Sequence, residues 1–112
     1  MRERKRKTKR KVMEKFAELV KGEKPVLVDF FATWCGPCKA MHPVLEDLKN
    51  RMGDRIHVIK IDVDGGTNRQ LVNALQIQSV PTLVLYKKGD IVWRQSGLME
   101  AAALQALIEK HL

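Results

Sequence analysis

Apolar and polar residues alternate along this chain in two different periods, and these periods predict a succession of helices and strands. Four segments carry apolar residues three or four positions apart, the spacing of one buried helix face; they lie at about 12–20, 35–50, 67–75 and 99–111. Shorter segments that are continuously apolar or alternate with a period of two are typical of strands; they lie at about 26–31, 55–62, 82–86 and 91–95. The predicted order is helix, strand, helix, strand, helix, β-hairpin, helix.

The boundaries of these elements are marked by residues that begin or end regular structure. Gly22 is suited to end the first helix, and Thr67 to cap the third helix with its hydroxyl. Pro43 lies inside the second helix, where it removes a backbone donor and is expected to cause a kink. Lys87-Lys88-Gly89-Asp90 separates two strand-like runs and predicts a hairpin turn. The spacing in the last helix predicts a buried face made of Ala103, Leu104, Leu107 and Ile108.

This element order predicts an α/β fold with one mixed sheet. Two strands separated by a helix pair in parallel through a right-handed crossover, whereas the strands of a hairpin pair antiparallel. The sequence contains no internal repeat, linker or second domain. The chain is therefore divided into a basic arm over residues 1–11 and a single domain over residues 12–112.

The positive charge of the chain is concentrated in the arm. Residues 1–11 hold eight lysines and arginines against one glutamate, so they carry +7 of the net charge of +8. Blocks of like charge are usually solvated, mobile arms, and we expect the same of this segment. Its charge would also allow nucleic acid or anionic membrane contact through residues 2–11, but we do not expect it to act in this way.

The composition restricts the class of protein. The chain is 45% hydrophobic and 30% charged, which is ordinary for a soluble globular domain. No apolar run approaches the roughly 20 residues that span a bilayer, and no apolar segment of a signal peptide follows the basic start. We therefore expect a cytoplasmic protein. A domain of this size with no obvious spare apolar face is also expected to be a monomer.

The two cysteines of the chain form one Cys-x-x-Cys motif, Trp34-Cys35-Gly36-Pro37-Cys38, directly behind a predicted strand. The motif falls where the second helix is expected to begin. The unpaired N–H groups and the positive dipole end of a helix N-terminus stabilise a thiolate relative to a thiol. Cys35 is therefore predicted to be a nucleophile, with Cys38 one turn later within disulfide reach. This arrangement predicts thiol–disulfide chemistry.

Several segments together resemble the thioredoxin family. Residues 28–39 resemble its active site, and Ser79-Val80-Pro81-Thr82-Leu83 resembles its cis-proline loop. Lys87-Lys88-Gly89-Asp90 and Ser96-Gly97 continue a resemblance that covers about residues 12–112. It implies a thioredoxin-like three-layer α/β/α sandwich with a mixed central sheet. Many members open with a short strand where this chain has its basic arm, so we expect that strand to be missing and the sheet to have four strands.

The resemblance also implies roles for individual residues. Cys35 would be the exposed cysteine that attacks a substrate disulfide, and Cys38 the more buried one that resolves the mixed disulfide. Asp29 resembles the family's buried carboxylate, which moves protons during resolution, and Lys60 matches the lysine that partners it. Further residues are implied to shape the active-site loop and the substrate-binding surface; they are Trp34, Gly36, Pro37, Val80, Pro81 and Gly97.

Two of these assignments compete with simpler interpretations. An aspartate in an apolar strand can point to an exposed face of the sheet, but the closeness of Asp29 to Cys35 favours burial. Desolvation would then raise its pKa toward the range of a proton shuttle at neutral pH. Most X-Pro bonds are trans, and only the family resemblance predicts a cis bond between Val80 and Pro81.

A metal site is not expected. His42 extends the motif to Cys-x2-Cys-x3-His, but a structural zinc site needs four ligands, and His57 and His111 lie far away without matching spacing. His42 could instead perturb the thiols. Haem attachment would need a histidine directly after Cys38, where the chain has Lys39. The resemblance implies a cysteine pair that works without a cofactor, with NADPH used indirectly through a reductase.

The leading functional hypothesis is a thiol–disulfide oxidoreductase that reduces disulfide-containing substrate proteins and is regenerated by thioredoxin reductase. Gly36-Pro37 between the cysteines resembles the reducing members of the family rather than the isomerase-like members, and a low-potential couple donates electrons in a reducing cytosol. Two alternatives are an extracytoplasmic thiol reductase and a non-catalytic thioredoxin-fold binding subunit. Cysteine-dependent turnover would distinguish the catalytic hypotheses from the binding subunit.

Overall fold

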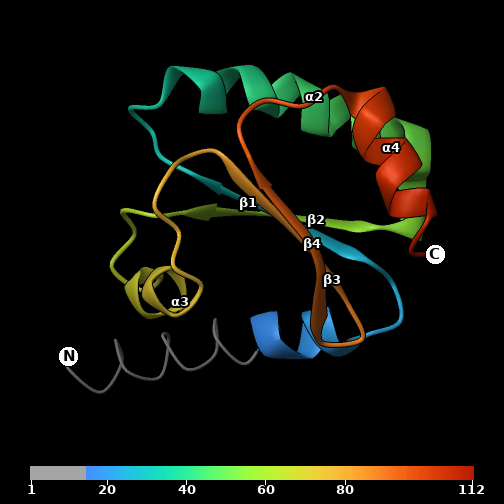
Figure 1. Cartoon of the computed structure of the whole chain (residues 1–112), viewed down its shortest axis with the longest axis horizontal. Helices are drawn as coiled ribbons and strands as arrows, with labels where there is room; N and C mark the ends of the chain where they lie inside the picture. The colour runs from blue at the N-terminus through green and yellow to red at the C-terminus, as the bar shows by residue number, and fades with distance from the viewer. Residues whose placement is uncertain (1–14) are drawn as a thin grey trace.

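A computed structural model describes residues 15–112 of the chain (Figure 1). The arm predicted over residues 1–11, and the beginning of the helix predicted at 12–20, lie outside the described residues; the described part of that first helix covers 15–21. The elements that follow it are β1 (Val26–Phe31), α2 (Gly36–Met52), a short 3₁₀ turn (Gly53–Arg55), β2 (His57–Asp62), α3 (Arg69–Ala74), β3 (Thr82–Lys87), β4 (Asp90–Ser96) and α4 (Ala101–Glu109).

The strands form one mixed sheet in the order β2-β1-β3-β4. β1 pairs in parallel with β2, placing Asp29 opposite Lys60, and pairs antiparallel with β3, placing Asp29 opposite Leu83. The hairpin strands β3 and β4 pair antiparallel, as predicted. The described residues therefore contain a four-stranded sheet. The position where a further strand was expected to be missing falls outside them.

The two faces of the sheet are covered by different helices, which confirms the predicted three-layer sandwich (Figure 1). Leu27 and its same-face neighbours on β3 pack beneath α2 and α4 in one buried cluster. Val28 and Phe30 face the other way and pack with the first helix and α3. β1 is thus buried on both faces, which explains why its sequence is almost continuously apolar.

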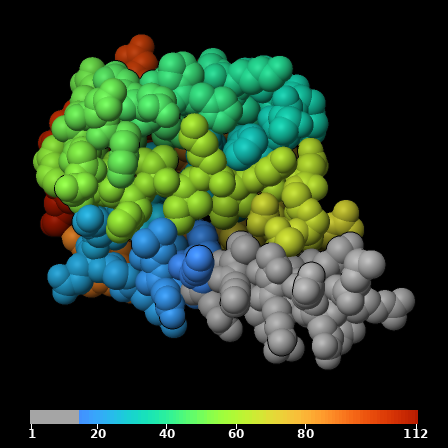
Figure 2. Space-filling view, turned by 180° about the vertical axis from the view of Figure 1, so that it is seen from behind, coloured from blue at the N-terminus to red at the C-terminus, as the bar shows by residue number. Residues whose placement is uncertain are grey.

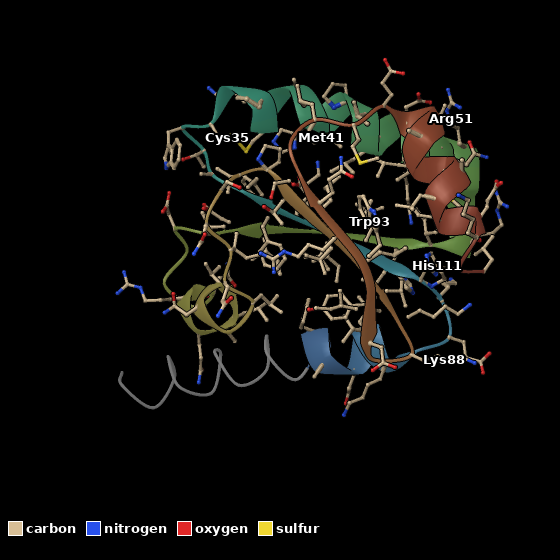
Figure 3. The ribbon with its side chains drawn as sticks, in the orientation of Figure 1. Cys35, Met41, Arg51, Lys88, Trp93 and His111 are labelled. Atoms are coloured by element: carbon tan, nitrogen blue, oxygen red, sulfur yellow. A yellow bond between two sulfur atoms is a disulfide. The ribbon has the colours of Figure 1, made fainter. Side chains whose placement is uncertain are left out.

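Seen from behind, α2 lies above the β2 edge of the sheet and the first helix lies below it (Figure 2). The Gly22 N–H donates to the Leu19 carbonyl at 3.3 Å, which closes the first helix where its end was predicted. α2 runs through Pro43 as a single helix of 17 residues. Trp93 on β4 packs against the cluster beneath α2 and α4 (Figure 3).

Two predictions about helix details are wrong. Asn68 rather than Thr67 occupies the N-cap position of α3, and it makes no capping bond with its side chain. Its amide nitrogen Nδ2 instead donates to the Asp62 carbonyl at 2.9 Å, because the loop after β2 folds back on itself before α3 begins. In α4 the buried positions are Ala101, Leu104 and Ile108, whereas Ala103 is exposed. The helix begins at Ala101, and its buried face follows the spacing of three and four residues from there.

We expect Leu104→Ala to lower the free energy of unfolding by about 3 kcal/mol, because it leaves a cavity between α2, α4 and the sheet. Leu112→Ala is the matched control: Leu112 is 53% exposed, and its truncation should cost less than about 0.5 kcal/mol. Urea unfolding followed by circular dichroism measures both values. Equal losses in the two variants would contradict the packing described for α4.

Candidate active site

The cysteine motif forms the N-terminus of α2. Cys35 is the N-cap residue with an extended backbone, and Pro37 lies in the first turn, where its missing N–H costs nothing. The backbone N–H of Cys38 donates to the Cys35 sulfur at 3.1 Å. The sulfur of Cys35 is therefore held at the positive end of the helix, where negative charge is stabilised. The helix itself begins at Gly36, so Cys35 lies at the helix N-terminus, where the sequence predicted it.

Cys35 and Cys38 are joined by a disulfide, with their Cα atoms 5.2 Å apart. Figure 3 shows Cys35 at the beginning of α2, with Met41 farther along the same helix. Cys38 is completely buried and Cys35 is 4% exposed. Cys35 is thus the more accessible of the two sulfur-bearing residues, but in this oxidised state it is much less open to solvent than the description of an exposed cysteine implied.

Trp34 covers one side of the motif while remaining 70% exposed. Its indole Nε1–H donates to the Asp64 carboxylate at 2.7 Å, which ties the active-site loop to the loop after β2. Asp64 in turn donates its backbone N–H to the Asp62 carboxylate. Sequence reasoning treated Asp64 only as part of a strand-breaking Asp-Gly-Gly. The bond between the Asp64 carboxylate and the Trp34 indole could have been predicted only by knowing that this turn faces Trp34.

The Val80-Pro81 peptide bond is cis, as the family resemblance predicted. The loop that carries it brings the Val80 carbonyl oxygen to 3.6 Å from the Cys35 sulfur. Gly97 lies beside the same loop and donates its N–H to the Pro81 carbonyl at 2.9 Å. The φ angle of Gly97 is 101°, and a side chain there would meet no neighbour within 4 Å, so the positive φ is what requires glycine.

A groove of about 260 Å³ runs from the motif along this loop. It is lined by Trp34, Val63, Asp64, Val72, Ile77, Gln78, Ser79 and Val80. Trp34 and Val80 are the two predicted substrate-binding residues that reach it. The fold therefore places Trp34 and the cis-proline loop along one open groove, with the Cys35 sulfur behind the Val80 carbonyl oxygen at 3.6 Å.

Asp29 is completely buried on β1, and neither of its carboxylate oxygens has a hydrogen-bond partner among the described residues. Desolvation by burial raises the pKa of Asp29 to about 6, and the positive charge of Lys60 opposes part of this increase. Lys60 is exposed on the neighbouring strand, directly opposite Asp29 in the register. The alternative of an aspartate on an exposed strand face is excluded for this position.

His42 lies on α2 one turn beyond Cys38, with its ring edge-on to Phe31 at a centroid distance of 5.6 Å. Its buried nitrogen Nδ1 has no hydrogen-bond partner in the described part of the chain. Residues 15–112 contain no group of three or more histidine, cysteine or acidic side chains arranged to hold a metal ion. His42 is therefore close to the cysteine pair without forming a ligand set with it.

A sequence model of the thioredoxin family matches residues 7–110, which is almost the whole chain. This match agrees with the two structural features of the site, the disulfide at the helix N-terminus and the cis-proline loop beside it. The chain belongs to the thioredoxin family. Its activity is thiol–disulfide oxidoreduction, as the cysteine motif predicted.

Individual members of the family are similar over most of the chain. A thioredoxin-like protein of Synechocystis is 48% identical over 85% of this chain and 90% of its own length. The thioredoxin of Bacillus subtilis is 46% identical over 78% of this chain and 82% of its own. The chloroplastic thioredoxin Y of Oryza sativa is 43% identical over 93% of this chain, and the chain spans 61% of the length of that relative.

Solved structures agree with the fold. A variant thioredoxin from Halobacterium salinarum superposes with a TM-score of 0.76 at 40% identity, covering 86% of this chain and 81% of its own. A thioredoxin from Nicotiana alata superposes with a TM-score of 0.79 at 33% identity, covering 91% of this chain and 85% of its own. The three-layer sandwich with a mixed sheet is therefore the thioredoxin fold.

We expect the Asp29→Asn protein to be more stable than wild type above pH 7. Between about pH 4 and pH 6 the folded wild type retains a proton on Asp29 that the unfolded chain has released, so its stability falls as pH rises. The total loss corresponds to about 3 kcal/mol. Urea unfolding of the oxidised proteins from pH 4 to pH 8 measures it, and parallel stability profiles for wild type and Asp29→Asn would contradict the burial of an ionisable carboxyl.

Proposed function

We propose that the chain reduces disulfides in substrate proteins, with Cys35 as the attacking cysteine and Cys38 as the resolving cysteine. The observation that carries this proposal is the position of the Cys35 sulfur, which accepts the Cys38 N–H at 3.1 Å and lies 3.6 Å from the carbonyl oxygen of Val80, a residue that lines the open groove. In the reduced protein the same N–H would stabilise a Cys35 thiolate. Cys38 is completely buried and is bonded to the Cys35 sulfur, which suits it to resolve a mixed disulfide on Cys35.

The reaction then proceeds in two exchanges. The Cys35 thiolate attacks one sulfur of the substrate disulfide, a bond forms between them, and the other substrate sulfur leaves with the electron pair of the broken bond. Cys38 loses its proton and attacks the Cys35 sulfur, which expels the second substrate thiolate and forms the Cys35–Cys38 disulfide. The substrate gains two electrons and the cysteine pair loses two.

Asp29 is proposed to accept the proton of Cys38 in the second exchange. A carboxyl with a pKa of about 6 is partly ionised near neutral pH and can both take up and release a proton there. Lys60, opposite Asp29 on β2, is proposed to favour the ionised carboxylate. Burial raises the pKa of the Asp29 carboxyl and Lys60 lowers it, and together they leave the pKa close to neutral pH.

Substrate is proposed to bind along the groove between Trp34 and the cis-proline loop. The exposed face of Trp34 and the apolar side chains of Val63 and Val80 provide contact area, and the Val80 backbone can pair with an extended substrate segment. Gly36 and Pro37 shape the loop that carries Cys35, while Pro81 and Gly97 keep the backbone next to it in position. The site is accordingly suited to an extended, disulfide-bearing polypeptide.

The oxidised cysteine pair is proposed to be regenerated by a thioredoxin reductase that uses NADPH. A protein of Mycobacterium leprae named bifunctional thioredoxin reductase/thioredoxin is 45% identical over 89 residues, covering 80% of this chain and 19% of that protein. Its name describes both activities in one polypeptide, which supports a reductase as the partner.

We further propose that the chain acts in electron transport as a cytoplasmic monomer. Within residues 15–112, no helix is long and apolar enough to cross a bilayer.

Wild-type protein should catalyse the reduction of insulin disulfides by dithiothreitol, and Cys35→Ser should abolish catalysis because the attacking sulfur is lost. Cys38→Ser should instead accumulate a mixed disulfide between Cys35 and substrate, visible by mass spectrometry. Turbidity of the released insulin chain measures the rate. A wild-type protein that does not reduce insulin would contradict the catalytic proposal. It would favour a non-catalytic binding subunit, whose function a Cys35→Ser, Cys38→Ser double variant would retain.

Deletion of residues 2–11 should leave insulin reduction unchanged, because every residue assigned to the site lies at or beyond Asp29 and residues 12–112 carry only +1 of the net charge of +8. The full chain and the truncated chain are compared in turnover and in retention on heparin and on anionic vesicles at low and physiological salt. Retention of the full chain alone at physiological salt, with stronger retention at low salt, would contradict the expectation that the arm is merely solvated. That result would favour a polyanion as a partner.

A further inference from the structure

The segment between α3 and β3, residues 75–81, forms much of the proposed substrate groove without belonging to a helix or a strand (Figure 1). Residues 77–80 line the groove, and the carbonyl oxygen of Val80 lies beside the Cys35 sulfur. Because the segment has no strand ladder of its own, its position depends on individual hydrogen bonds from its neighbours. The side chain of Arg94 donates two of them.

Arg94 reaches this segment from β4, the edge strand of the described sheet. It lies opposite Val84 in the antiparallel pairing of β3 and β4, and side chains directly opposite each other project from the same face of a sheet. Val84 belongs to the cluster that packs with the first helix and α3, so Arg94 extends over that face. Its positive charge also opposes the increase that burial causes in the pKa of Tyr86, another residue of this cluster.

The guanidinium of Arg94 binds two consecutive backbone carbonyls directly after α3. Its Nη1 donates to the Leu75 carbonyl, and its Nη2 donates to the Gln76 carbonyl at 2.9 Å. Carbonyls at the C-terminus of a helix have no amide left in the helix to pair with, and the planar guanidinium offers two donors in a fixed geometry that satisfies both. These carbonyls directly precede the residues that line the groove.

The end of α3 adopts a backbone conformation that its own sequence does not favour. The N–H of Gln76 donates to the Asn73 carbonyl and the N–H of Ile77 to the Val72 carbonyl, both at 3.1 Å. This pattern is a Schellman motif, in which the left-handed position is usually glycine. Here the position is Gln76, with a φ angle of 52°, where its Cβ crowds the following carbonyl. The bonds from Arg94 therefore support a turn that is unfavourable by itself.

We infer that Arg94 is a positioning residue for substrate binding: its guanidinium fixes the start of segment 75–81 and thereby holds one side of the groove in the conformation that binds a polypeptide. This inference rests on the proposed function, since it concerns the groove in which substrate is proposed to lie. Arg94 itself is not one of the residues that line the groove. It acts through the backbone of Leu75 and Gln76.

Loss of Arg94 would release only the start of the segment. The far end stays attached to β4, because the Gly97 N–H donates to the Pro81 carbonyl at 2.9 Å. Without Arg94, residues 75–80 would leave the binding conformation in part of the molecules. The apparent affinity for a polypeptide falls in proportion to the fraction that retains this conformation. The reactivity of Cys35 depends on the N-terminus of α2 and would be unchanged.

The test compares a polypeptide disulfide with a small one. Reduced full-length protein is mixed with insulin or with bis(2-hydroxyethyl) disulfide, which is too short to extend along the groove. Oxidation is followed by tryptophan fluorescence in a stopped-flow instrument. Arg94→Met keeps a long side chain but removes the donors, and it should lower the rate constant for insulin about threefold or more. The rate constant for the small disulfide should equal that of wild type.

Three further variants separate the paired hydrogen bonds from the charge. Arg94→Lys keeps the charge without the fixed pair of donors, so it should also react more slowly with insulin. Arg69→Met removes a positive charge from an exposed position on α3 and should react like wild type with both disulfides. Adding Gln76→Gly to Arg94→Met should restore most of the lost rate, because glycine adopts the left-handed conformation without steric cost.

The inference would be overturned if Arg94→Met reacted with insulin as fast as wild type does. It would also be overturned if Arg94→Lys matched wild type, since the charge alone would then suffice. An equal loss of rate with both disulfides would indicate an effect on the cysteines instead of the groove. A lack of rescue by Gln76→Gly would contradict the support that Arg94 gives to the turn.

The same assays separate this inference from the proposed function. If wild type shows Cys35-dependent reduction of insulin while the Arg94 variants react like wild type, only the positioning role of Arg94 is wrong. If wild type shows no Cys35-dependent reduction of insulin, the proposed function itself is wrong.

Discussion

The burial of β1 on both faces is the constraint on which the rest of the structure depends. β1 lies between β2 and β3, and its even-numbered and odd-numbered side chains fill the two cores on opposite sides of the sheet. This fixes the strand rigidly and places the loop that follows it at the N-terminus of α2. It also forces Asp29 into an apolar environment, where the neutral acid is favoured over the carboxylate.

Much of the site could be predicted because it depends on short segments of sequence. The Cys-x-x-Cys motif behind an apolar strand predicts a helix N-terminus, and Cys35 is the N-cap of α2. Short apolar runs, either continuous or alternating with polar residues, likewise predicted all four strands of the described sheet. The burial of Asp29 followed from its place between apolar neighbours and close to the motif.

What the sequence could not supply depends on contacts between distant loops. The bond from Trp34 to Asp64 joins residues 30 positions apart, and nothing in an Asp-Gly-Gly turn indicates its partner. The contact of His42 with Phe31 requires the angle at which α2 crosses β1. The cap of α3 was misassigned to Thr67 because the loop folds back through Asn68, whose amide bonds a carbonyl six residues earlier. Local propensity favours a threonine cap, and tertiary contacts overrode it.

The measurement that tests this account most directly is a titration of the Asp29 carboxyl by carbon-13 NMR in the oxidised protein. The account attributes the raised pKa to the burial of β1, with Lys60 as a weaker opposing influence, and predicts a midpoint near pH 6. A midpoint near 3.8, the value of an aspartate in solution, would show that the carboxyl is solvated. That result would contradict both the burial of Asp29 and its role in moving protons to and from Cys38.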